Sequence, residues 1–439
     1  MGHGHDAPTA APDGGDDHPG PGADGLPPAP GPERAAAWLL RVSGEDRPGI
    51  TADLMTVLGL VGVQVQDLEQ VLVRGFLTLA AALGHPPGGA DALREVVEQF
   101  AREHGLHVDL SPAPAPVPEQ LHVDAVTVLG HGFETPLSPE ELGAVAGGVA
   151  AAGGNIDRIV RLARYPVHAY EFRVTGADRL ALRRHLGEAA ASHRLDIALQ
   201  PAGLERRAKR LVVLDVDSTL IQDEVIELLA AEAGCLDQVR DITERAMAGE
   251  LDFASALRER VRLLRDLDLV ALERARSRMR LTPGARTFVR TLKRLGYAVG
   301  IVSGGFTHFT DGLAAELGLD HAVANVLEVA DGRLTGRVIG DVVDRARKAE
   351  LLRDFAAAAG IPLSQTVAVG DGANDLDMLA AAGLGVAFNA KPVVQEAADT
   401  TVNVPYLDAI LFVLGVTRSE VEQADAGVGP GPLSPVRPE

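Results

Sequence analysis

The chain has 439 residues, of which 46% are apolar, enough for two or three domains with hydrophobic cores. Its 41 basic and 61 acidic residues give a formal net charge of −20, and no basic block interrupts this acidic excess. We therefore expect neither nucleic acid nor an anionic membrane surface as a partner. An anionic substrate would have to be held by a few local cations.

The first segment, residues 1–33, combines Gly, Pro and Asp with almost no large apolar side chains. Such a segment cannot bury enough surface to offset its ordering entropy, so we expect a disordered tail. It lacks the basic and apolar regions of a secretory signal, and no uncharged apolar run reaches the about 18 residues of a membrane span. Cys235 is the only cysteine, which suits a reducing compartment. These features predict a cytoplasmic protein.

Two segments of similar pattern follow, 34–110 and 120–203, separated by a Pro-rich extended spacer at 111–119. Each shows the order strand, helix, strand, strand, helix, strand, which predicts two βαββαβ units of ferredoxin-like topology. In the first unit the expected elements are 38–42, a helix ending near 60, 63–72, 76–83, 91–104 and 107–110. In the second they are 121–129, 139–152, 156–163, 169–174, 179–193 and 196–199.

The segment Asp46-Arg47-Pro48-Gly49-Ile50 resembles the opening of an ACT domain, a small regulatory module that binds amino acids. This resemblance implies a ligand carboxylate at a helix N-terminus, with Gly49 permitting close approach of the backbone. Asp46 and Gly49 are therefore candidate regulatory residues, and Gly130 holds the equivalent place in the second unit. The alternative is that this segment is only a turn that leads into a helix.

From residue 204 the pattern changes, because three apolar runs each end in a polar cluster. The first ends in Asp215-Val216-Asp217-Ser218-Thr219, the second in Ser303-Gly304-Gly305, and the third in a cluster that contains Asp371. Continuous apolar runs are typical of buried parallel strands, whose carboxyl ends share the edge where ligands bind. We therefore expect an α/β domain at 204–420 with a Rossmann-like parallel sheet, followed by a flexible tail at 421–439.

The interval between Asp215 and Ser303 is too long for a single crossover helix. Its helical patterns predict an inserted cap at about 222–281 that covers the carboxyl edge of the sheet. After the cap, a crossover helix is expected at 283–295 and a β-hairpin at 326–338 that turns at Asp331-Gly332. The expected cap helices are 224–233, 236–248, 253–264 and 269–279.

These clusters have the chemistry of a phosphate monoesterase. Asp215 can attack phosphorus as a carboxylate nucleophile, and Asp217 can act as general acid and then as general base. A hard cation is needed between two anions, and Mg²⁺ could be bound by Asp215, Asp371 and the backbone carbonyl of Asp217.

Three further groups can stabilise the transferred phosphate. Ser303 offers a hydroxyl, Gly304 offers its backbone N–H, and Lys348 can bring a compact positive charge. In order, DVDST, the Ser303 motif, Lys348 and GDGANDLDM resemble the four motifs of the haloacid dehalogenase superfamily. The alternative, that Asp215 and Asp371 merely cap helices or form turns, requires this ordered set to arise by chance.

The stretch from Asp215 through the predicted cap further resembles the phosphoserine phosphatase family. This resemblance implies hydrolysis of O-phospho-L-serine in the last step of serine biosynthesis. It implies that Glu224 meets the substrate ammonium and that Arg260 pairs with its carboxylate. By the same resemblance Met247 and Phe253 shield the site from water, and Asn374 and Asp375 order its surroundings.

The ACT-like units suggest L-serine or another amino acid as an effector, and their edge strands favour a homodimer. Two alternatives of function stay open at this point. One is a related phosphatase or phosphotransferase that acts on another small phosphoester. The other is an amino-acid-sensing regulator built on an inactive phosphatase.

Overall fold

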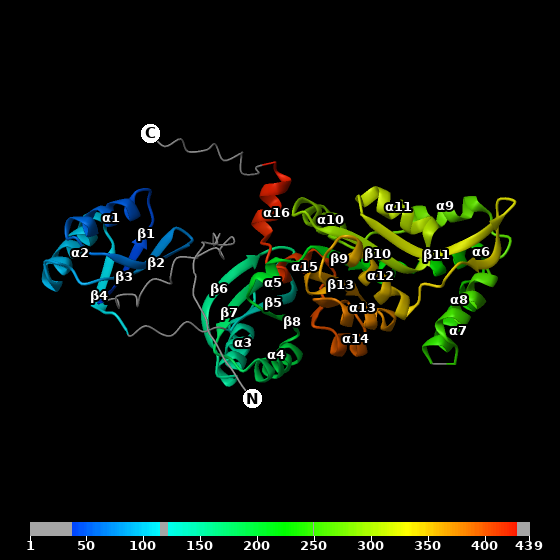
Figure 1. The fold of residues 1–439 in the computed structure, drawn as a ribbon, viewed down its shortest axis with the longest axis horizontal. Coiled ribbons are helices and arrows are strands. Elements are labelled where there is room, and N and C mark those ends of the chain that lie inside the picture. Colours follow the sequence, from blue (N-terminus) through cyan, green and yellow to red (C-terminus); the bar gives the residue numbers. More distant parts are fainter. Residues whose placement is uncertain (1–36, 115–121, 249, 428–439) are drawn as a thin grey trace, which may run out of the picture. The chain divides into compact units, whose positions relative to one another are not determined.

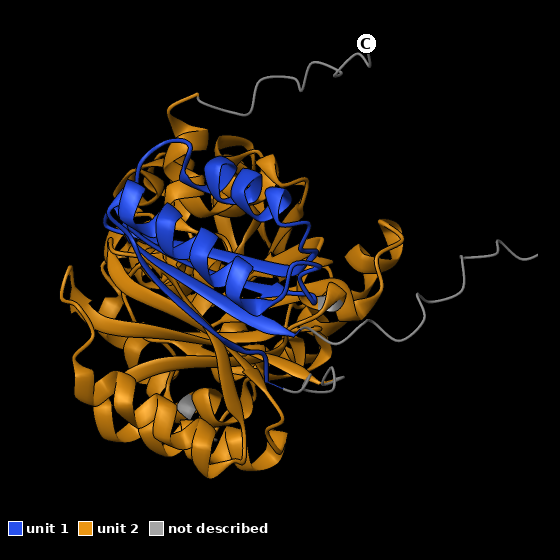
Figure 2. Cartoon of the chain, turned by 90° about the vertical axis from the view of Figure 1, so that its left-hand side faces the viewer, with its two compact units in different colours: residues 1–119 blue, residues 120–439 orange. Residues whose placement is uncertain are grey.

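The structure is a computed structural model that describes residues 37–114, 122–248 and 250–427. The chain divides into two compact units, residues 1–119 and 120–439 (Figure 2). The expected tail at 1–33 and most of the expected spacer lie outside the described residues. Within the described ranges, no helix has the length and apolar character needed to cross a membrane.

The first unit is a four-stranded antiparallel sheet in the order β2-β3-β1-β4, with two helices on one face (Figures 1 and 2). Leu77, Leu79, Ala81 and Leu83 alternate along β3 and point toward the helices, because successive side chains of a strand face opposite sides. The elements are β1 (Trp38–Glu45), α1 (Ile50–Leu60), β2 (Val65–Val73), β3 (Phe76–Leu83), α2 (Ala90–His104) and β4 (His107–Pro112).

The second unit begins with a sheet of the same topology, in the order β6-β7-β5-β8. Its helix α3 starts at a Ser138–Glu141 capping box, in which each side chain accepts a hydrogen bond from the other residue's backbone N–H. The elements are β5 (Val123–Phe133), α3 (Pro139–Ala151), β6 (Asn155–Ala163), β7 (Val167–Thr175), α4 (Arg179–His193) and β8 (Leu195–Pro201).

A seven-stranded sheet follows, in the order β12-β11-β10-β9-β13-β14-β15, and only the β11–β12 pair is antiparallel. The chain leaves β9 toward β10 on one side and later returns to β13 on the other, so β9 lies at a topological switch point. The strands are β9 (Leu211–Leu214), β10 (Ala298–Phe306), β11 (His321–Ala330), β12 (Arg333–Ile339), β13 (Thr366–Gly370), β14 (Gly385–Phe388) and β15 (Thr400–Val402).

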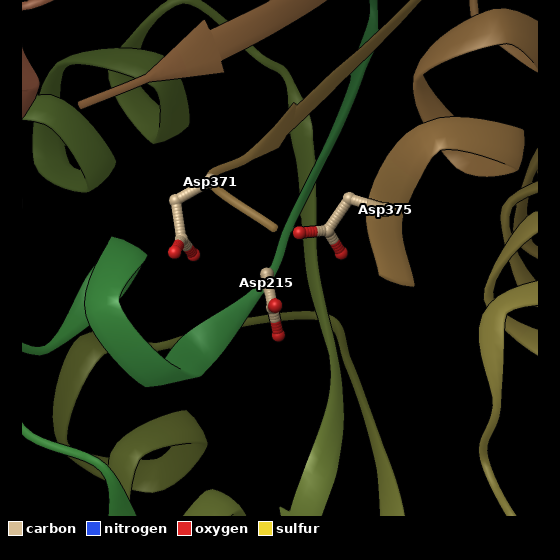
Figure 3. A group of neighbouring side chains, drawn as sticks. All are labelled: Asp215, Asp371 and Asp375. Atoms are coloured by element: carbon tan, nitrogen blue, oxygen red, sulfur yellow. The ribbon is translucent and has the colours of Figure 1, made fainter. Parts of the chain in front are cut away.

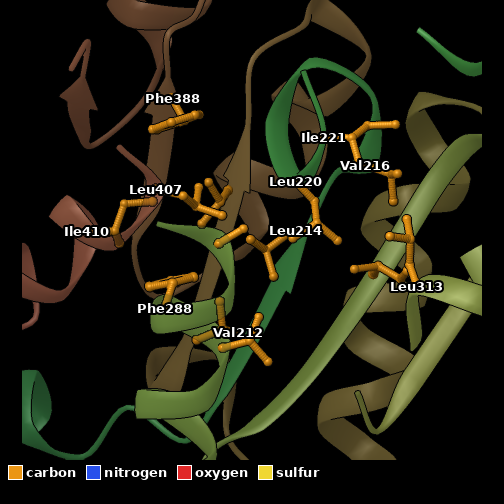
Figure 4. Close-up of a cluster of buried hydrophobic side chains, with 14 of the residues drawn as sticks. Val212, Leu214, Val216, Leu220, Ile221, Phe288, Leu313, Phe388, Leu407 and Ile410 are labelled. Carbon is orange, nitrogen blue, oxygen red and sulfur yellow. The ribbon is translucent and has the colours of Figure 1, made fainter. Parts of the chain in front are cut away.

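Both faces of this sheet are covered, which explains why β9 has no polar residue. Val212 and Leu214 face one apolar cluster, shown in Figure 4, whereas Leu211 and Val213 face another. The layers are built from α5 (Leu204–Arg207), α10 (Ala285–Arg294), α11 (Thr307–Leu317), α12 (Arg345–Ala358), α13 (Leu376–Ala381), α14 (Pro392–Ala397), α15 (Ile410–Val413) and α16 (Arg418–Asp425).

Four helices between β9 and β10 form the cap: α6 (Val225–Ala233), α7 (Leu236–Met247), α8 (Phe253–Arg262) and α9 (Leu269–Arg278). Helices α8 and α9 start at Asp252 and Asp268, whose carboxylates accept backbone N–H bonds from the first turn. The predicted fold class is thereby confirmed: a parallel-sheet α/β core with a helical insertion, preceded by two βαββαβ units.

Several details differ from the expectations. Strand β4 extends through Ser111 and Pro112 because it pairs with β1 as far as Trp38, so the spacer begins later. Strand β5 continues to Phe133, which places Gly130 within a strand and not in a loop. Helix α16 runs to Asp425, past the expected end at 420, and its Asp425 accepts hydrogen bonds from Arg290.

Candidate active site

The turn after β9 brings two carboxylates to the carboxyl edge of the sheet. Asp215 is 2% exposed, and the irregular turn η1 (Val216–Leu220) follows it, with Ser218 in the left-handed region at φ 57°. Asp217 accepts hydrogen bonds at both oxygens, from the Val225 N–H at 2.7 Å and the Ser303 hydroxyl at 3.0 Å. The two aspartates therefore have different surroundings although they are two residues apart.

Strand β10 contributes the second group of the site. The Ser303 hydroxyl is fully buried, donates to Asp217 and accepts the Gly305 N–H at 2.7 Å. A Cβ atom on Gly305 would lie 2.9 Å from Ser303 Oγ and 3.0 Å from Asp217 Oδ2, closer than real Cβ contacts. A glycine is therefore required here, because the backbone passes directly beside both polar side chains.

Lys348, on helix α12, is the buried cation of the site. Its ammonium contacts Asp215 Oδ2 at 2.7 Å and Asp375 Oδ1 at 2.8 Å, and its side chain is 1% exposed. Asn374 also donates to Asp215 Oδ2, at 3.3 Å. Burial opposes the charge of Lys348, but the carboxylates of Asp215 and Asp375 outweigh that effect and raise its pKa. The lysine therefore stays charged, in contact with both aspartates.

The remaining acids are shifted toward their neutral forms. Burial, followed by the Glu224 and Asp215 carboxylates, raises the pKa of Asp217 to about 7. Burial and Asp215 raise the pKa of Asp371 to about 6 and that of Asp375 to about 8. Burial raises the pKa of Glu224 as well. Such shifts in one cleft are typical of acid–base sites.

Asp215, Asp371 and Asp375 offer carboxylate oxygens that all lie within 4.8 Å of one another (Figure 3). Of these three residues, Asp375 is already engaged, because it accepts bonds from Lys348 and from the Gly372 N–H at 3.1 Å. Asp371 accepts the Thr219 hydroxyl at 3.0 Å with one oxygen. Hard oxygen ligands crowded around one ammonium fit a divalent cation such as Mg²⁺, which would relieve the repulsion between them.

A cavity of about 540 Å³ lies between the sheet edge and the cap. Arg260 lines it from α8, and its guanidinium donates to the Thr243 hydroxyl at 3.3 Å and the Ala256 carbonyl at 3.3 Å. Burial lowers the pKa of Arg260, whereas Glu224 and Asp217 raise it. The cavity is lined by Asp215, Asp217, Glu224, Ile226, Thr243, Ala246, Leu251, Phe253, Ala256, Leu257, Arg260, Gly304, Gly305, Asp371, Gly372, Ala373, Asn374 and Lys391.

Most of the predicted site residues therefore lie in or next to one cavity. Phe253 covers Gly304, since a Cβ on that glycine would lie 3.0 Å from the Phe253 ring. Glu224 accepts the Ser218 hydroxyl at 2.8 Å. The side chain of Met247 is not among the described ones, so its predicted contact with substrate stays a prediction.

Thr219 and Lys391 are two of the site residues that were not singled out from the sequence. Thr219 is fully buried, follows the strand next to the one that precedes Asp371, and donates its hydroxyl to that carboxylate. Its place in the DVDST motif could have identified it as a site residue. Lys391 lines the cavity, and its backbone N–H donates to the Asp371 carbonyl at 3.4 Å. No local pattern marks Lys391, because it reaches the site only through the packing of β13 beside β14.

The candidate regulatory residues lie in the two ferredoxin-like sheets. Gly49 adopts φ 100° at the start of α1, where an added Cβ would meet Asp53 Oδ2 at an ordinary 3.9 Å, and the Asp46 N–H donates to the Gly75 carbonyl at 2.8 Å. At Gly130 a Cβ would instead lie 2.9 Å from the Leu137 side chain. Gly130 therefore has a packing reason to be glycine that needs no ligand.

Comparison with known proteins agrees with this architecture. Residues 212–380 match the haloacid dehalogenase-like hydrolases, and residues 37–111 and 122–200 each match an ACT domain family. A phosphoserine phosphatase from Streptomyces coelicolor is 57% identical over 400 residues, covering 90% of this chain and 97% of that protein. The phosphoserine phosphatase SerB2 from Mycobacterium tuberculosis is 49% identical over 396 residues, covering 89% and 95%.

Among solved structures, the chain is similar to the unliganded form of a probable phosphoserine phosphatase from Vibrio cholerae. The two are 35% identical with a TM-score of 0.54, and the match covers 70% of this chain and 89% of that one.

Proposed function

The chain belongs to the phosphoserine phosphatase family of haloacid dehalogenase-like hydrolases, and we propose that it hydrolyses O-phospho-L-serine to L-serine and phosphate through an aspartyl phosphate at Asp215. One observation carries the proposal. Asp215 ends the central strand at the base of the cavity, with Lys348 and Asn374 on one oxygen and Asp217 two residues away. A nucleophile, a balancing cation and an acid thus converge at one point.

In the first step, a carboxylate oxygen of Asp215 forms a bond to phosphorus while the bond from phosphorus to the serine oxygen breaks. The leaving oxygen takes a proton from Asp217, whose pKa of about 7 keeps much of it protonated at neutral pH. We assign phosphate oxygens to the Gly304 N–H and to the Ser303 hydroxyl, which would turn to the phosphate from Asp217. Lys348 keeps the negative charge of the nucleophile balanced.

In the second step, Asp217, now a carboxylate after the loss of its proton, takes a proton from water. That water attacks the aspartyl phosphate, which releases phosphate and restores Asp215. The raised pKa of Asp217 suits both directions of proton transfer, because an acid–base catalyst works best near the operating pH.

Mg²⁺ is the proposed cofactor, and Asp215, Asp371 and the backbone carbonyl of Asp217 would hold it. Both carboxylate oxygens of Asp217 are already used by Val225 and Ser303, which leaves its carbonyl as the available ligand. When bound, the ion would supply charge neutralisation between phosphate and carboxylate.

Substrate choice is assigned to Glu224 and Arg260, which line the same cavity from the start of α6 and from α8. A carboxylate suits the ammonium of phosphoserine, and a guanidinium suits its carboxylate through two parallel hydrogen bonds. Among the described residues, no acidic side chain forms an ion pair with Arg260. Its Nε and Nη1 donate to Ala256 and Thr243, which leaves Nη2 and the second Nη1 hydrogen for a ligand.

A panel of phosphoesters tests this assignment. Phosphate release is measured for O-phospho-L-serine, phosphoethanolamine, phosphohomoserine and p-nitrophenyl phosphate, with and without alcohol acceptors. The proposal predicts the highest kcat/KM for O-phospho-L-serine and transfer to water. A higher kcat/KM for another ester, or phosphate transfer to an alcohol, would instead assign another substrate or a phosphotransferase.

Three further proposals concern the setting of the enzyme. We assign it to the last step of serine biosynthesis, since its product would be L-serine, and to the cytoplasm, since its only cysteine permits no internal disulfide.

We also propose a homodimer. Strand β2 lies at the edge of its sheet and is exposed along its whole length, including Leu68, Val71 and Leu72. An apolar edge of this kind is stabilised by pairing.

L-serine is the proposed effector, at the Gly49 end of α1. The left-handed conformation of Gly49 and its lack of a side chain support close approach of a ligand to the first turn of the helix. Asp53 in that turn contacts His104 at 3.9 Å, and an incoming carboxylate would have to displace or share this contact. Calorimetry with L-serine on the full-length protein and on Gly49→Val checks this binding.

A further inference from the structure

The sheet of the second ACT-like domain is packed against the phosphatase core. Leu129, Leu162, Val167 and Ala169 belong to the same apolar cluster as Leu407 and Ile410 of the core. Strand β8 also lies beside β15, and Gln200 on β8 donates to the Val413 carbonyl at 2.8 Å. The second domain is therefore docked on the catalytic domain by a substantial interface.

Within this interface, Asp196 of β8 is a buried carboxylate that holds a single core residue with both oxygens. It is 1% exposed. Its Oδ2 accepts the Asn403 N–H at 2.6 Å, and its Oδ1 accepts the Asn403 side-chain amide at 2.8 Å. His131 Nε2, from β5, contacts the same Oδ2 at 3.1 Å. A buried charge with this many partners fixes its neighbour firmly, because every displacement leaves a charge unpaired.

Asn403 is also hydrogen-bonded toward the loop that follows β14, residues 389–391. Its side-chain oxygen accepts Gln395 Nε2 at 3.0 Å, and the same Gln395 nitrogen donates to the Ala390 carbonyl at 2.6 Å. Ala390 precedes Lys391, which lines the catalytic cavity and whose N–H donates to the carbonyl of Asp371. Three residues, Asn403, Gln395 and Ala390, thus separate Asp196 from the cavity wall.

The loop has a reason to need such support. Asn389 adopts φ 45°, a left-handed conformation that is uncommon for a residue with a side chain, although Asn tolerates it better than most. It is held there by its N–H bond to Val402 at 2.9 Å, at the end of β15 next to Asn403. The conformation of the loop therefore depends on contacts with β15 and the residues that follow it.

We propose that Asp196 is a positioning residue for catalysis: through Asn403 and Gln395 it holds the 389–391 loop against the active site, so that docking of the second ACT-like domain sets the geometry of the cavity wall. This inference rests on the proposed phosphatase function for its kinetic readout. The competing interpretation is that Asp196 only holds the two domains together.

The experiment compares Asp196→Ala and Gln395→Ala with Gln200→Ala in the full-length protein. Gln200 is the matched control, because it lies on the same strand and donates across the same interface without contacting the loop. We expect kcat/KM to fall about 2- to 30-fold in the first two variants and to stay unchanged in Gln200→Ala, although all three lower Tm. The double variant Asp196→Ala/Gln395→Ala should be no worse than the worse single variant.

A second readout does not depend on phosphoserine turnover. Hydrogen exchange of the Lys391 amide should accelerate in Asp196→Ala and Gln395→Ala but not in Gln200→Ala, and hydrolysis of p-nitrophenyl phosphate should fall in parallel. If wild-type protein fails on phosphoserine but the exchange pattern holds, the proposed substrate is wrong and the positioning role stands. If Asp196→Ala lowers Tm without changing Lys391 exchange or kcat/KM, or if the two losses add, Asp196 is only a docking contact.

Discussion

Asp215 and Asp217 are chemically identical side chains to which we assign different tasks, and their neighbours make the difference. Asp215 contacts the Lys348 ammonium, which balances the negative charge of a nucleophile. Asp217 forms no ion pair with any basic side chain in the described part of the chain, and burial beside Glu224 and Asp215 raises its pKa to about 7. Pairs of acids whose surroundings separate their protonation states are a general sign of acid–base division of labour.

Replacing Arg260 by Ala tests substrate choice. We expect kcat/KM for O-phospho-L-serine to fall by roughly 2–5 kcal/mol in transition-state stabilisation, because the substrate carboxylate loses its buried partner. Phosphoethanolamine, which lacks the carboxylate, should be hydrolysed nearly as before. Steady-state kinetics on both substrates checks this.

Arg258→Ala is the matched control, since Arg258 is exposed on the same helix and does not line the catalytic cavity. It should leave both substrates unaffected. Equal losses on both substrates in Arg260→Ala would mean that Arg260 supports the fold of the cap instead of selecting the substrate.

Gly305→Ala tests the close approach of β10 to the site. The new methyl group would collide with Ser303 Oγ and Asp217 Oδ2, so one of them must move. We expect kcat to fall about 10²-fold or more, the size of effect seen when a transition-state donor is displaced. Steady-state measurement of phosphate release from O-phospho-L-serine gives the decrease in kcat.

Gly187→Ala provides the comparison. Gly187 is exposed on α4, with nothing within 4 Å of its added Cβ. Alanine there should leave kcat unchanged and raise the free energy of unfolding by about 0.5–1 kcal/mol, since glycine is unfavourable inside a helix. An active Gly305→Ala enzyme would show that Ser303 and Asp217 need not hold the positions described.

At the scale of elements, the sequence predicts best where strands carry chemistry at their ends. The strands that lead to Asp215, Ser303 and Asp371 were all located from their apolar runs, and the four cap helices begin within one residue of the expected positions. Strands β14 and β15, of four and three residues, were not predicted, because no catalytic motif follows either of them to mark a strand end.

The docking of the second domain could not be foreseen from the sequence. Asp196 and Asn403 are about two hundred positions apart, and nothing in either local pattern indicates a buried contact. Lys391 was missed for the same reason. Such long-range contacts depend on how helices and strands pack after they have formed. The catalytic motifs can be recognised because they depend on residues that are adjacent in the sequence.

The His131–Asp196 contact predicts how the interface responds to pH. The hydrogen bond to Asp196 raises the pKa of His131, against burial and against Arg194, the other charged group that acts on it. The stabilisation is therefore fully present below the ordinary histidine pKa of about 6.5 and is lost as pH rises through the higher folded-state value.

Thermal unfolding across this pH range measures the effect. Wild-type stability should decline with rising pH more steeply than that of His131→Gln, which keeps a donor near Asp196 but does not titrate. Parallel pH profiles in the two proteins would show that His131 carries no linked charge.

At the scale of the whole molecule, the two ACT-like domains are predicted to differ in what their removal does. The first domain forms a compact unit of its own, whereas the second contributes some of its sheet residues to the apolar cluster of the phosphatase core, besides having a cluster of its own. A chain that begins at Gln120 should therefore keep its Tm and phosphoserine hydrolysis. A chain that begins at Ala202 would expose Leu407 and Ile410 and should have a lower Tm.

The same truncations test regulation by serine. L-serine can inhibit as a simple product at the active site, so only a non-competitive component counts. We expect that component, with a coupling of about 5- to 150-fold in affinity, to disappear in the chain that begins at Gln120. If non-competitive inhibition survives the loss of the first domain, its Gly49 site is not the sensor.

The central claim is that this chain cleaves O-phospho-L-serine through a covalent phosphate on Asp215 with Mg²⁺ in the site. The most direct measurement is release of inorganic phosphate from O-phospho-L-serine by wild type and Asp215→Asn, each with Mg²⁺ and after chelation. We predict rapid release by wild type with Mg²⁺, little after chelation, and none above background in Asp215→Asn, because an amide cannot form the acyl phosphate. Turnover by Asp215→Asn at more than a few per cent of wild type, or undiminished release without a divalent cation, would contradict the account.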